Sequence, residues 1–508
     1  MSTAAGARPR LSVAMIARDA AGVIAASLQS VRAIADEIVV LDTGSRDATG
    51  AIAQSAGARV ISVAWEDDFA AARNRCLDEL TGDWVLWIDA GEQLSPRCAV
   101  PLRDFVDRGA DLEKAYLVMV ETPAPQADGD PEQAARIRLM PRRAGLRFVG
   151  RVRESIKPAM AQLGMELELA PWRMLRTERE HDADVKRERA LRNLRLIERE
   201  VQERGPSAAL FLALGEACVA LQQPGKARDY FRRALGAASR GSTDMLSAYY
   251  GLLTCQADSA EPNAPLELCI AALEVFPYDS QLLCAMGAYL QQQGHLPLAQ
   301  RSYRAAHQFG QVDPETWHVR AIGEIAAICL SLNLQLSGDD PAAMLVLDEA
   351  FARYPQSPRV GRRRLELHVK HGQTTAALAE IDRLGLDRAE RDVLRSAVRG
   401  ACVASQRNWI PALAYLETAY TAGCRDPLCL RWYVAALVAT GNPSLARKVL
   451  DDWAQLEPDC VELAQVRKSL SSGDAPTEAV ARQPGSGVPR PHLSSLGASR
   501  VASPPAAR

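Results

Sequence analysis

Three short clusters of charged and small residues are the best candidates for chemistry, and each directly follows an apolar run. They are Arg18-Asp19, the segment Asp42-Thr43-Gly44-Ser45 and the segment Asp89-Ala90-Gly91-Glu92. Carboxylates suit hard cations such as Mg²⁺ or Mn²⁺, and they also accept hydrogen bonds from ribose hydroxyls. These clusters are therefore where a ligand-binding site is to be sought.

The apolar runs before these clusters predict buried strands. They are rich in Val and Ile and cover residues 11–17, 37–42, 59–63 and 83–89. Amphipathic segments at residues 24–34, 47–56 and 69–80 separate them. The alternation predicts a mostly parallel sheet with helices on both faces, in which ligands bind beyond the carboxyl ends of the strands. A dinucleotide-binding sheet is the alternative, but no GxGxxG segment follows the first strand.

A helical pattern recurs between about residues 206 and 458. Aromatic or aliphatic, Gly and Ala residues keep fixed offsets in two copies: Phe211, Leu214, Gly215, Ala227, Phe231 and Ala234, then Leu283, Met286, Gly287, Ala299, Tyr303 and Ala306. The small residue that begins the second helix recurs at Pro265, Ala343, Ala377, Ala412 and Ala446, and the last four are 34, 35 and 34 residues apart. This is the tetratricopeptide length, which a generic helical bundle would not keep. Ala and Gly at fixed offsets predict close helix crossings, and the stacked units should form a superhelix with a concave face for a peptide or protein.

The pattern divides the chain into five parts. We expect a flexible N-terminus at 1–10, an α/β domain at 11–180, a connecting helix at 181–205, repeats at 206–470 and a disordered tail at 471–508. The connecting helix carries Leu191, Leu194, Ile197 and Val201 on one stripe, which should dock it. The tail is too poor in large apolar residues to form a core.

Composition restricts the class of protein further. The 508 residues include 60 Lys and Arg against 62 Asp and Glu, and the net charge of −2 argues against a general nucleic-acid binder. The apolar run at 11–17 is too short for a secretory signal or a membrane span, so a cytoplasmic protein is predicted. The 11 cysteines contain no CxxC pair and are expected to be reduced core residues.

Several motifs in one register carry a family resemblance. The segments LSVAMIARD, DEIVVLDTGSRDAT and AWEDDFAAARNRCLDELTGDWVLWIDAGE, and more weakly RLMPRRAGLRFVGRVRESI, run in this order along the chain. Together they resemble the bacterial family-two glycosyltransferases of the GT-A fold that carry tetratricopeptide repeats behind the catalytic domain. The likeness is strong over residues 11–92 and weaker over 138–156.

The resemblance implies roles for particular residues. Asp19 and Asp42 would hold the nucleobase and ribose of a nucleotide-sugar, with Gly44 and Ser45 forming the turn. Arg73 and Asn74 would lie beside the nucleotide, with Arg73 toward its diphosphate. Asp89 would face the ribose and, with Glu92, bind a divalent Mn²⁺ or Mg²⁺ ion, and Glu154 would act as the base that deprotonates the acceptor.

The chain also departs from the family's motifs. The D-x-D segment reads Asp89-Ala90-Gly91, so the second carboxylate is missing, and the usual His-Glu pair reads Arg153-Glu154. The family's Asn after the first strand is Asp19. Because Gly91 cannot ligate a metal, these changes bear on metal-dependent turnover, although Arg153 could supply part of the metal's charge.

Two functions from different classes follow. One is an inverting glycosyltransferase that moves a sugar from a nucleotide-sugar donor to a protein or peptide acceptor held by the repeats. The other is a weakened or inactive domain that serves with its repeats as a protein-binding scaffold. Local alternatives also stay open: helix capping for Asp42 and Asp89, an exposed helical arginine for Arg73, and a surface carboxylate for Glu154. The sequence leaves homodimer formation undecided.

Overall fold

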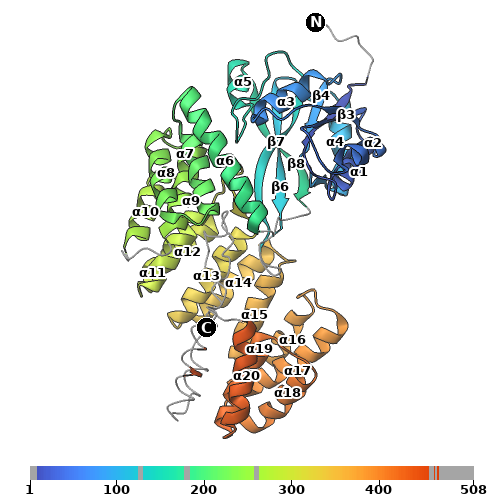
Figure 1. The fold of residues 1–508 in the computed structure, drawn as a ribbon. Coiled ribbons are helices and arrows are strands. Elements are labelled where there is room, and N and C mark those ends of the chain that lie inside the picture. The colour runs from blue at the N-terminus through green and yellow to red at the C-terminus, as the bar shows by residue number, and fades with distance from the viewer. Residues whose placement is uncertain are drawn as a thin grey trace, which may run out of the picture. The chain divides into compact units, whose positions relative to one another are not determined.

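The structure is a computed structural model that describes residues 8–123, 130–176, 183–256 and 263–456 together with positions 463, 466 and 467. The predicted tail at 471–508 and most of the flexible start lie outside these residues. The chain forms two compact units. Of the described residues, the first unit takes those up to Pro277 and 312–320, and the second takes 278–311 and those from Ala321 (Figure 1).

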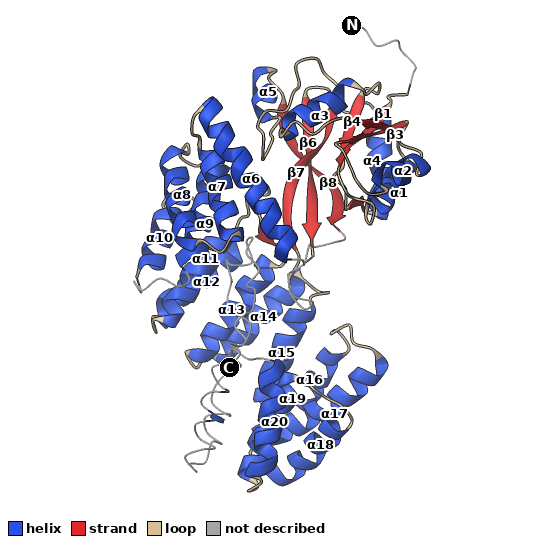
Figure 2. Ribbon diagram, viewed as in Figure 1, coloured by secondary structure: helices blue, strands red, loops and turns tan. Residues whose placement is uncertain are grey.

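The first unit is built on a mixed sheet, drawn in red in Figure 2. Its strand order is β3-β2-β1-β4-β7-β6-β8-β5, and β9 pairs with β7. The strands are β1 Leu11–Ala17, β2 Glu37–Asp42, β3 Arg59–Ser62, β4 Trp84–Trp87, β5 Glu92–Leu94, β6 Lys114–Thr122, β7 Glu132–Pro141, β8 Glu166–Arg176 and β9 His318–Val319. The four strands predicted from the sequence are β1 to β4, and they pair in parallel with β1 between β2 and β4. Their carboxyl ends therefore lie along one edge.

The second half of the sheet is largely antiparallel. β7 pairs antiparallel with both β4 and β6, and β5 pairs antiparallel with β8, whereas β6 and β8 are parallel. β7 therefore lies between the parallel half and β6, and its residues extend the edge on which the predicted clusters lie.

Helices cover both faces of the parallel half, as predicted. They are α1 Ile24–Arg32, α2 Thr49–Ser55, α3 Phe69–Asp78, α4 Pro96–Asp107 and α5 Lys157–Gln162. On β1, Val13 and Met15 pack in a core with α1 and α4, while Ala14 packs in a core with α3 and α5. This alternation follows from the period of two along a strand. The predicted fold class, an α/β domain followed by a helical repeat region, is confirmed.

The remaining elements of both units are almost all helical. The first unit contains α6 Ala183–Arg204, α7 Ala208–Ala220, α8 Pro224–Ala237, α9 Thr243–Gln256 and α10 Ala264–Leu273. The second contains α11 Ser280–Gln292, α12 Leu296–Phe309, α13 Ile322–Leu336, α14 Asp340–Arg353, α15 Pro358–Lys370, α16 Thr374–Ile381, α17 Arg388–Ser405, α18 Trp409–Thr421, α19 Pro427–Ala439 and α20 Pro443–Leu456. Each small residue predicted to begin a second helix lies near the start of α8, α10, α12, α14, α16, α18 or α20 and is buried.

The glycines of the repeat pattern mark close helix crossings, as predicted. A Cβ added to Gly215 would lie 2.5 Å from the ring of Phe231, and one added to Gly287 would lie 2.6 Å from the ring of Tyr303. Real Cβ atoms are not found this close to another heavy atom, so only glycine fits there. Close contact with an aromatic ring of the next helix therefore explains why glycine recurs at this position of the repeat.

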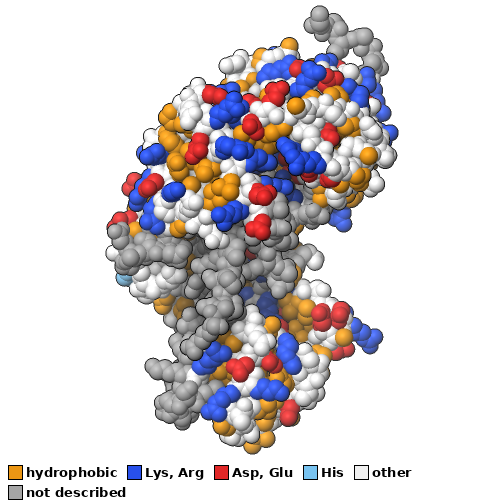
Figure 3. Space-filling view, viewed as in Figure 1, with side chains coloured by type: hydrophobic (Ala, Val, Ile, Leu, Met, Phe, Trp, Pro, Cys, Tyr) orange, Lys and Arg blue, Asp and Glu red, His pale blue; other side chains and the backbone are white. Residues whose placement is uncertain are grey.

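Three further observations bear on the class of protein. Among the described residues, no helix is long and apolar enough to cross a membrane. Every described cysteine is free, and all but Cys98 are buried, as predicted. On the face seen in Figure 3, Lys and Arg side chains are interspersed with Asp and Glu.

Candidate active site

The loops that follow β1 and β2 are tied together by hydrogen bonds. The backbone N–H of Asp19 donates to the hydroxyl of Ser45 at 3.0 Å, and the N–H of Arg46 donates to Asp19 Oδ1 at 2.7 Å. Asp19 has a φ of +48°, in the left-handed region that Asp tolerates better than most residues. Ala17 and Asp42 are register partners in the parallel pair, so the two loops leave the sheet as neighbours. The predicted residues Asp19 and Ser45 are thus in contact.

Asp42 shapes the turn after β2. Its Oδ1 accepts hydrogen bonds from the N–H of Gly44 at 3.1 Å, the N–H of Ser45 at 2.8 Å and the Ser45 hydroxyl at 2.7 Å. Gly44 has a φ of +92°, which other residues adopt only with strain. Oδ2 faces Gly50 of α2, whose added Cβ would lie 3.3 Å away. The turn is therefore built by Oδ1, while Oδ2 lies on the side of α2.

Arg73 of α3 is the centre of a second group. Its Nε donates to Glu154 Oε1 at 2.5 Å, and its Nη2 donates to Asp89 Oδ1 at 3.2 Å. Its guanidinium carbon lies 4.3 Å from the ring centroid of Trp87 and 5.3 Å from that of Phe148. With 11% of its side chain exposed, Arg73 is not the exposed helical arginine of the alternative interpretation. The structure thus brings three predicted residues together: Arg73, Asp89 and Glu154.

Asp89 and Glu92 share a buried arginine. Arg138 of β7 donates from Nη2 to Asp89 Oδ2 and to Glu92 Oε1, both at 2.6 Å. Arg176, the last residue of β8, donates from Nη2 to the same Glu92 oxygen at 3.2 Å. Glu92 is fully buried, and its Oε2 accepts from the backbone N–H of Asp89 at 3.2 Å. Both carboxylates predicted as metal ligands are therefore engaged by guanidinium groups.

The arginines determine the charge state of the group. Burial alone would raise the pKa of Asp89, but Arg138, Arg73 and Arg176 hold it well below its usual range. Burial likewise opposes the charge on Arg138, yet Asp89 and Glu92 raise the pKa of that guanidinium above its ordinary value. Both members of this pair are therefore ionised at neutral pH.

These residues do not fit a divalent metal ion as they are arranged. A Mg²⁺ or Mn²⁺ site needs several oxygen ligands that are free to coordinate. Asp89 already binds Arg73 and Arg138, Glu92 binds Arg138 and Arg176, and Gly91 has no side chain. Within the described ranges, no group of three His, Cys, Asp or Glu residues that could hold a metal ion occurs. A metal at Asp89 and Glu92 would require these ion pairs to break.

Arg153, which the sequence suggested as a substitute for the metal's charge, pairs elsewhere. Its Nη1 lies 3.2 Å from Glu216 Oε1 on α7, and its φ is +55°. Its charge still reaches Arg136 of β7: burial, with Arg153 and Arg138 nearby, lowers the pKa of Arg136 to about 10. The ring of Trp317, next to β9, lies 4.7 Å from the Arg136 guanidinium. Arg153 therefore contributes to the local positive charge without contacting Asp89.

Asn74 holds the segment that carries Glu154. Its Nδ2 donates to the carbonyl of Phe148 at 2.9 Å, and its Oδ1 accepts from the N–H of Phe148 at 2.8 Å. Three residues further on, the N–H of Arg151 donates to Glu200 of α6 at 2.6 Å. Ile197 of the same helix is buried with Leu194 and Val201 beside it, as the predicted stripe requires, whereas Leu191 is exposed. The connecting helix thus supports the loop before Glu154.

The sequence interpretation missed Arg136, Arg138 and Arg176. Arg136 and Arg138 are two residues apart in β7, at the point where the pairing with β6 shifts in register. Two arginines with this spacing inside an otherwise apolar run are a signal for a buried charge cluster. Arg176 gives no such local signal.

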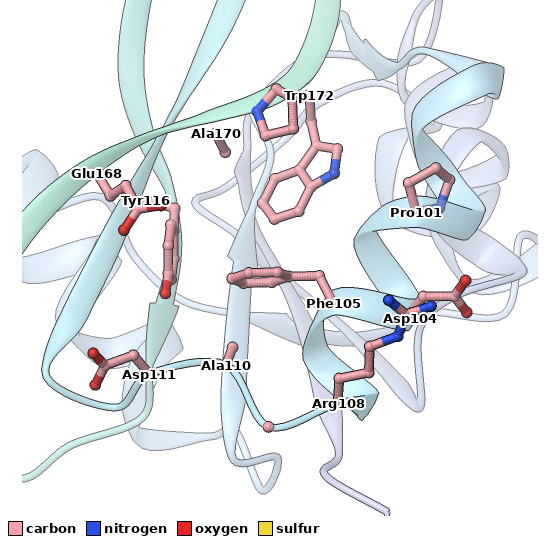
Figure 4. A pocket seen from close by; sticks show the side chains of 12 residues that line it. Pro101, Asp104, Phe105, Arg108, Ala110, Asp111, Tyr116, Glu168, Ala170 and Trp172 are labelled. Carbon is pink, nitrogen blue, oxygen red and sulfur yellow. The ribbon is translucent and has the colours of Figure 1, made fainter.

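A separate cavity of about 560 Å³ lies between α4 and strands β6 and β8. Phe105, Tyr116 and Trp172 meet there edge to face, and Asp104, Arg108 and Asp111 lie around them (Figure 4). None of the residues that line the cavity belongs to the predicted site. The strand-end geometry, rather than this cavity, therefore identifies the candidate site.

Comparison with known proteins relates the sheet domain to glycosyl transferases. Residues 12–126 match the family model of Glycosyl transferase family 2. A TPR repeat-containing protein of Synechococcus elongatus is 44% identical over 115 residues, which is 23% of this chain and 28% of that protein. An uncharacterized glycosyltransferase of Rickettsia felis is 37% identical over 86 residues, covering 17% of this chain and 30% of that protein. The alignments thus span less than a third of the length of these relatives.

Two solved structures are similar to parts of the chain. A tetratricopeptide repeat protein from Parabacteroides merdae covers 52% of this chain and 98% of its own, with 13% identity and a TM-score of 0.40. Glucosyl-3-phosphoglycerate synthase from Mycobacterium tuberculosis, in complex with Mn²⁺, UDP and glucosyl-3-phosphoglycerate, covers 23% of this chain and 44% of its own, with 27% identity and a TM-score of 0.19. Residues 12–126 are therefore similar to family 2 glycosyl transferases, and the helices behind them keep the tetratricopeptide spacing, as the sequence resemblance predicted.

Proposed function

We propose that the protein transfers a sugar from a nucleotide-sugar to a protein or peptide acceptor that the repeats recruit, with inversion at the anomeric carbon. The observation that carries this proposal is the meeting of Arg73, Asp89 and Glu154 beyond β4, on the edge where β1 and β2 also end. Ligands of such sheets bind at this edge. The match of residues 12–126 to the transferase family supports the same reaction.

Different residues of the site bind different parts of the nucleotide-sugar donor. In the proposal, Asp42 and Asp19 contact the nucleobase and ribose, and the turn at Gly44 and Ser45 keeps these two carboxylates in place. Asp89 accepts from the ribose while it orients Arg73. Arg73 donates to the diphosphate, whose negative charge grows as the sugar leaves.

The reaction itself is a single displacement. An acceptor hydroxyl, amide or thiol attacks the anomeric carbon, and the bond from that carbon to the diphosphate oxygen breaks. The acceptor's proton passes to Glu154, and the nucleoside diphosphate leaves with the electron pair of the broken bond. Arg73 binds Glu154 Oε1 and thus fixes the orientation of the carboxylate toward the acceptor. One base and one leaving-group stabiliser are sufficient for inversion.

A scaffold without turnover is the second candidate, and one observation favours it. Gly91 stands where a second carboxylate would lie, and each carboxylate of the Arg73 group is already paired with an arginine. In this alternative the ion pairs stabilise the domain alone, and the repeats carry the function by binding a protein.

Release of nucleoside diphosphate from a panel of UDP-sugars and GDP-sugars distinguishes the two candidates. The full chain should release UDP or GDP from at least one donor, and Glu154→Gln should reduce the rate by about 100-fold or more, as loss of a general base does. Glu168→Gln is the matched control, because Glu168 is an exposed carboxylate whose partner is Lys114. Release by wild type and by both variants at equal rates would remove Glu154 from the mechanism.

A further inference from the structure

The arginines around Asp89 outnumber the carboxylates that they face. Arg73, Arg138 and Arg176 contact Asp89, Glu92 or Glu154. Arg136 and Arg153 add two further positive charges, and Glu216 adds one negative charge through its pair with Arg153. Together these five guanidinium groups and four carboxylates leave an excess of one positive charge, which comes from Arg136, whose hydrogen bonds go to backbone carbonyls.

This balance disfavours a divalent cation and favours an anion. A dication placed beside Asp89 would raise the excess from one positive charge to three, and each carboxylate oxygen that it took would leave an arginine without its partner. Breaking a buried ion pair in this way is costly because an uncompensated charge remains. A diphosphate would instead bring negative charge to a site that already has an excess of donors.

Two features show that the donor capacity of the arginines is not exhausted. Arg138 Nε is buried and has no hydrogen-bond partner among the described residues. Arg176 is 38% exposed at its side chain and, among the described residues, donates one side-chain hydrogen bond, at 3.2 Å, to Glu92. The guanidinium group has five N–H donors in a planar fork that matches phosphate oxygens. Arg176 is therefore the member of the group that is best able to turn toward a ligand.

We infer that the diphosphate of the donor is bound by Arg73 and Arg176 in place of a divalent metal, with Arg138 as the positioning residue beneath them. This inference rests on the proposed function, since it assigns the cation that balances the donor's diphosphate. Arg138 contacts both Asp89 and Glu92, so that neither carboxylate faces the incoming phosphates without a cationic partner. Nucleotide binding by this protein is accordingly independent of Mn²⁺ and Mg²⁺.

Calorimetric titration of the full chain with UDP and GDP, each in EDTA and in Mn²⁺, tests the inference. The nucleotide that binds should do so with the same dissociation constant in both conditions, to within about twofold. Arg176→Ala should weaken the diphosphate about tenfold or more through loss of a charge-assisted hydrogen bond. The same variant should leave binding of the corresponding monophosphate within about twofold, a difference that a merely structural role of Arg176 would not produce.

Arg173→Ala is the matched control, because Arg173 is an arginine of the same strand that is half exposed and lies near Glu121 instead. It should bind like wild type. Binding that EDTA abolishes and Mn²⁺ restores would overturn the inference and leave the proposed transferase intact. Undiminished diphosphate affinity in Arg176→Ala would also overturn it. No binding of either diphosphate under any condition would overturn the proposed function itself, and this inference with it.

Discussion

Substitution of Gly91 separates the effect of backbone strain from the effect of charge. Gly91 has a φ of +90°, and an added Cβ would meet only Val23, at 3.9 Å. Gly91→Ala and Gly91→Asp therefore share a backbone strain of roughly 1–3 kcal/mol but no steric clash. Both should lower the melting temperature by several degrees and by similar amounts.

The charge effect is the difference between the two variants. Gly91→Asp adds a carboxylate next to Asp89, so in EDTA it should bind UDP or GDP several-fold more weakly than Gly91→Ala, because like charges oppose each other near the diphosphate. A loss of about tenfold corresponds to about 1.4 kcal/mol. The assay is calorimetric titration of wild type and both variants in EDTA and in Mn²⁺. Tighter binding by Gly91→Asp than by wild type in EDTA would refute the reasoning, since a new anion cannot assist an arginine-bound diphosphate.

Three further outcomes are expected. Asp42→Asn retains an oxygen for the turn but removes the charge, so nucleotide affinity measured by calorimetry should fall while the melting temperature changes little; unchanged affinity would remove Asp42 from the nucleotide site. Gly215→Ala should lower the free energy of unfolding, measured by chemical denaturation, by about 1–3 kcal/mol because its methyl group would overlap Phe231. Gly236→Ala, in open space on α8, should instead raise it by up to about 1 kcal/mol. Equal changes in the two variants would contradict the close helix crossing. The folded state depresses the pKa of Asp89, so the stability that this carboxylate contributes is present above its unfolded pKa and is lost as the pH falls through the folded value. Asp89→Asn should therefore lose less stability than wild type on acidification below about pH 4. If the free energy of unfolding falls equally with pH in both proteins, Asp89 does not contribute in this way.

The sequence predicted the parallel half of the sheet well because its strands are short, apolar and rich in branched residues. The predicted ranges 11–17 and 37–42 coincide with β1 and β2, and 59–63 and 83–89 differ from β3 and β4 by one to three residues. The repeat helices were found by their period. Both signals are local or periodic, which is why one sequence is sufficient to detect them.

The arginine partners of the site could not be predicted in the same way. Arg138 reaches Asp89 across 49 residues, and Arg176 reaches Glu92 across 84 residues. β9 contacts β7 across 185 residues, from Gln133 to His318. Such pairs depend on the order of strands in the antiparallel half, which local patterns do not specify. For the same reason the sequence assigned Glu92 to a metal, whereas the structure buries it between two arginines.

Inverting transfer of a sugar to a protein acceptor can be observed in the product itself. The full chain is incubated with acceptor proteins and the donor that supports release of nucleoside diphosphate, and the glycosylated peptide is analysed by mass spectrometry and NMR spectroscopy. We expect a peptide that gains the mass of one sugar residue and whose anomeric configuration is opposite to that of the donor. Retention of the donor's configuration would contradict the single displacement with Glu154 as base, and a chain that transfers no sugar from any donor would contradict the transferase itself.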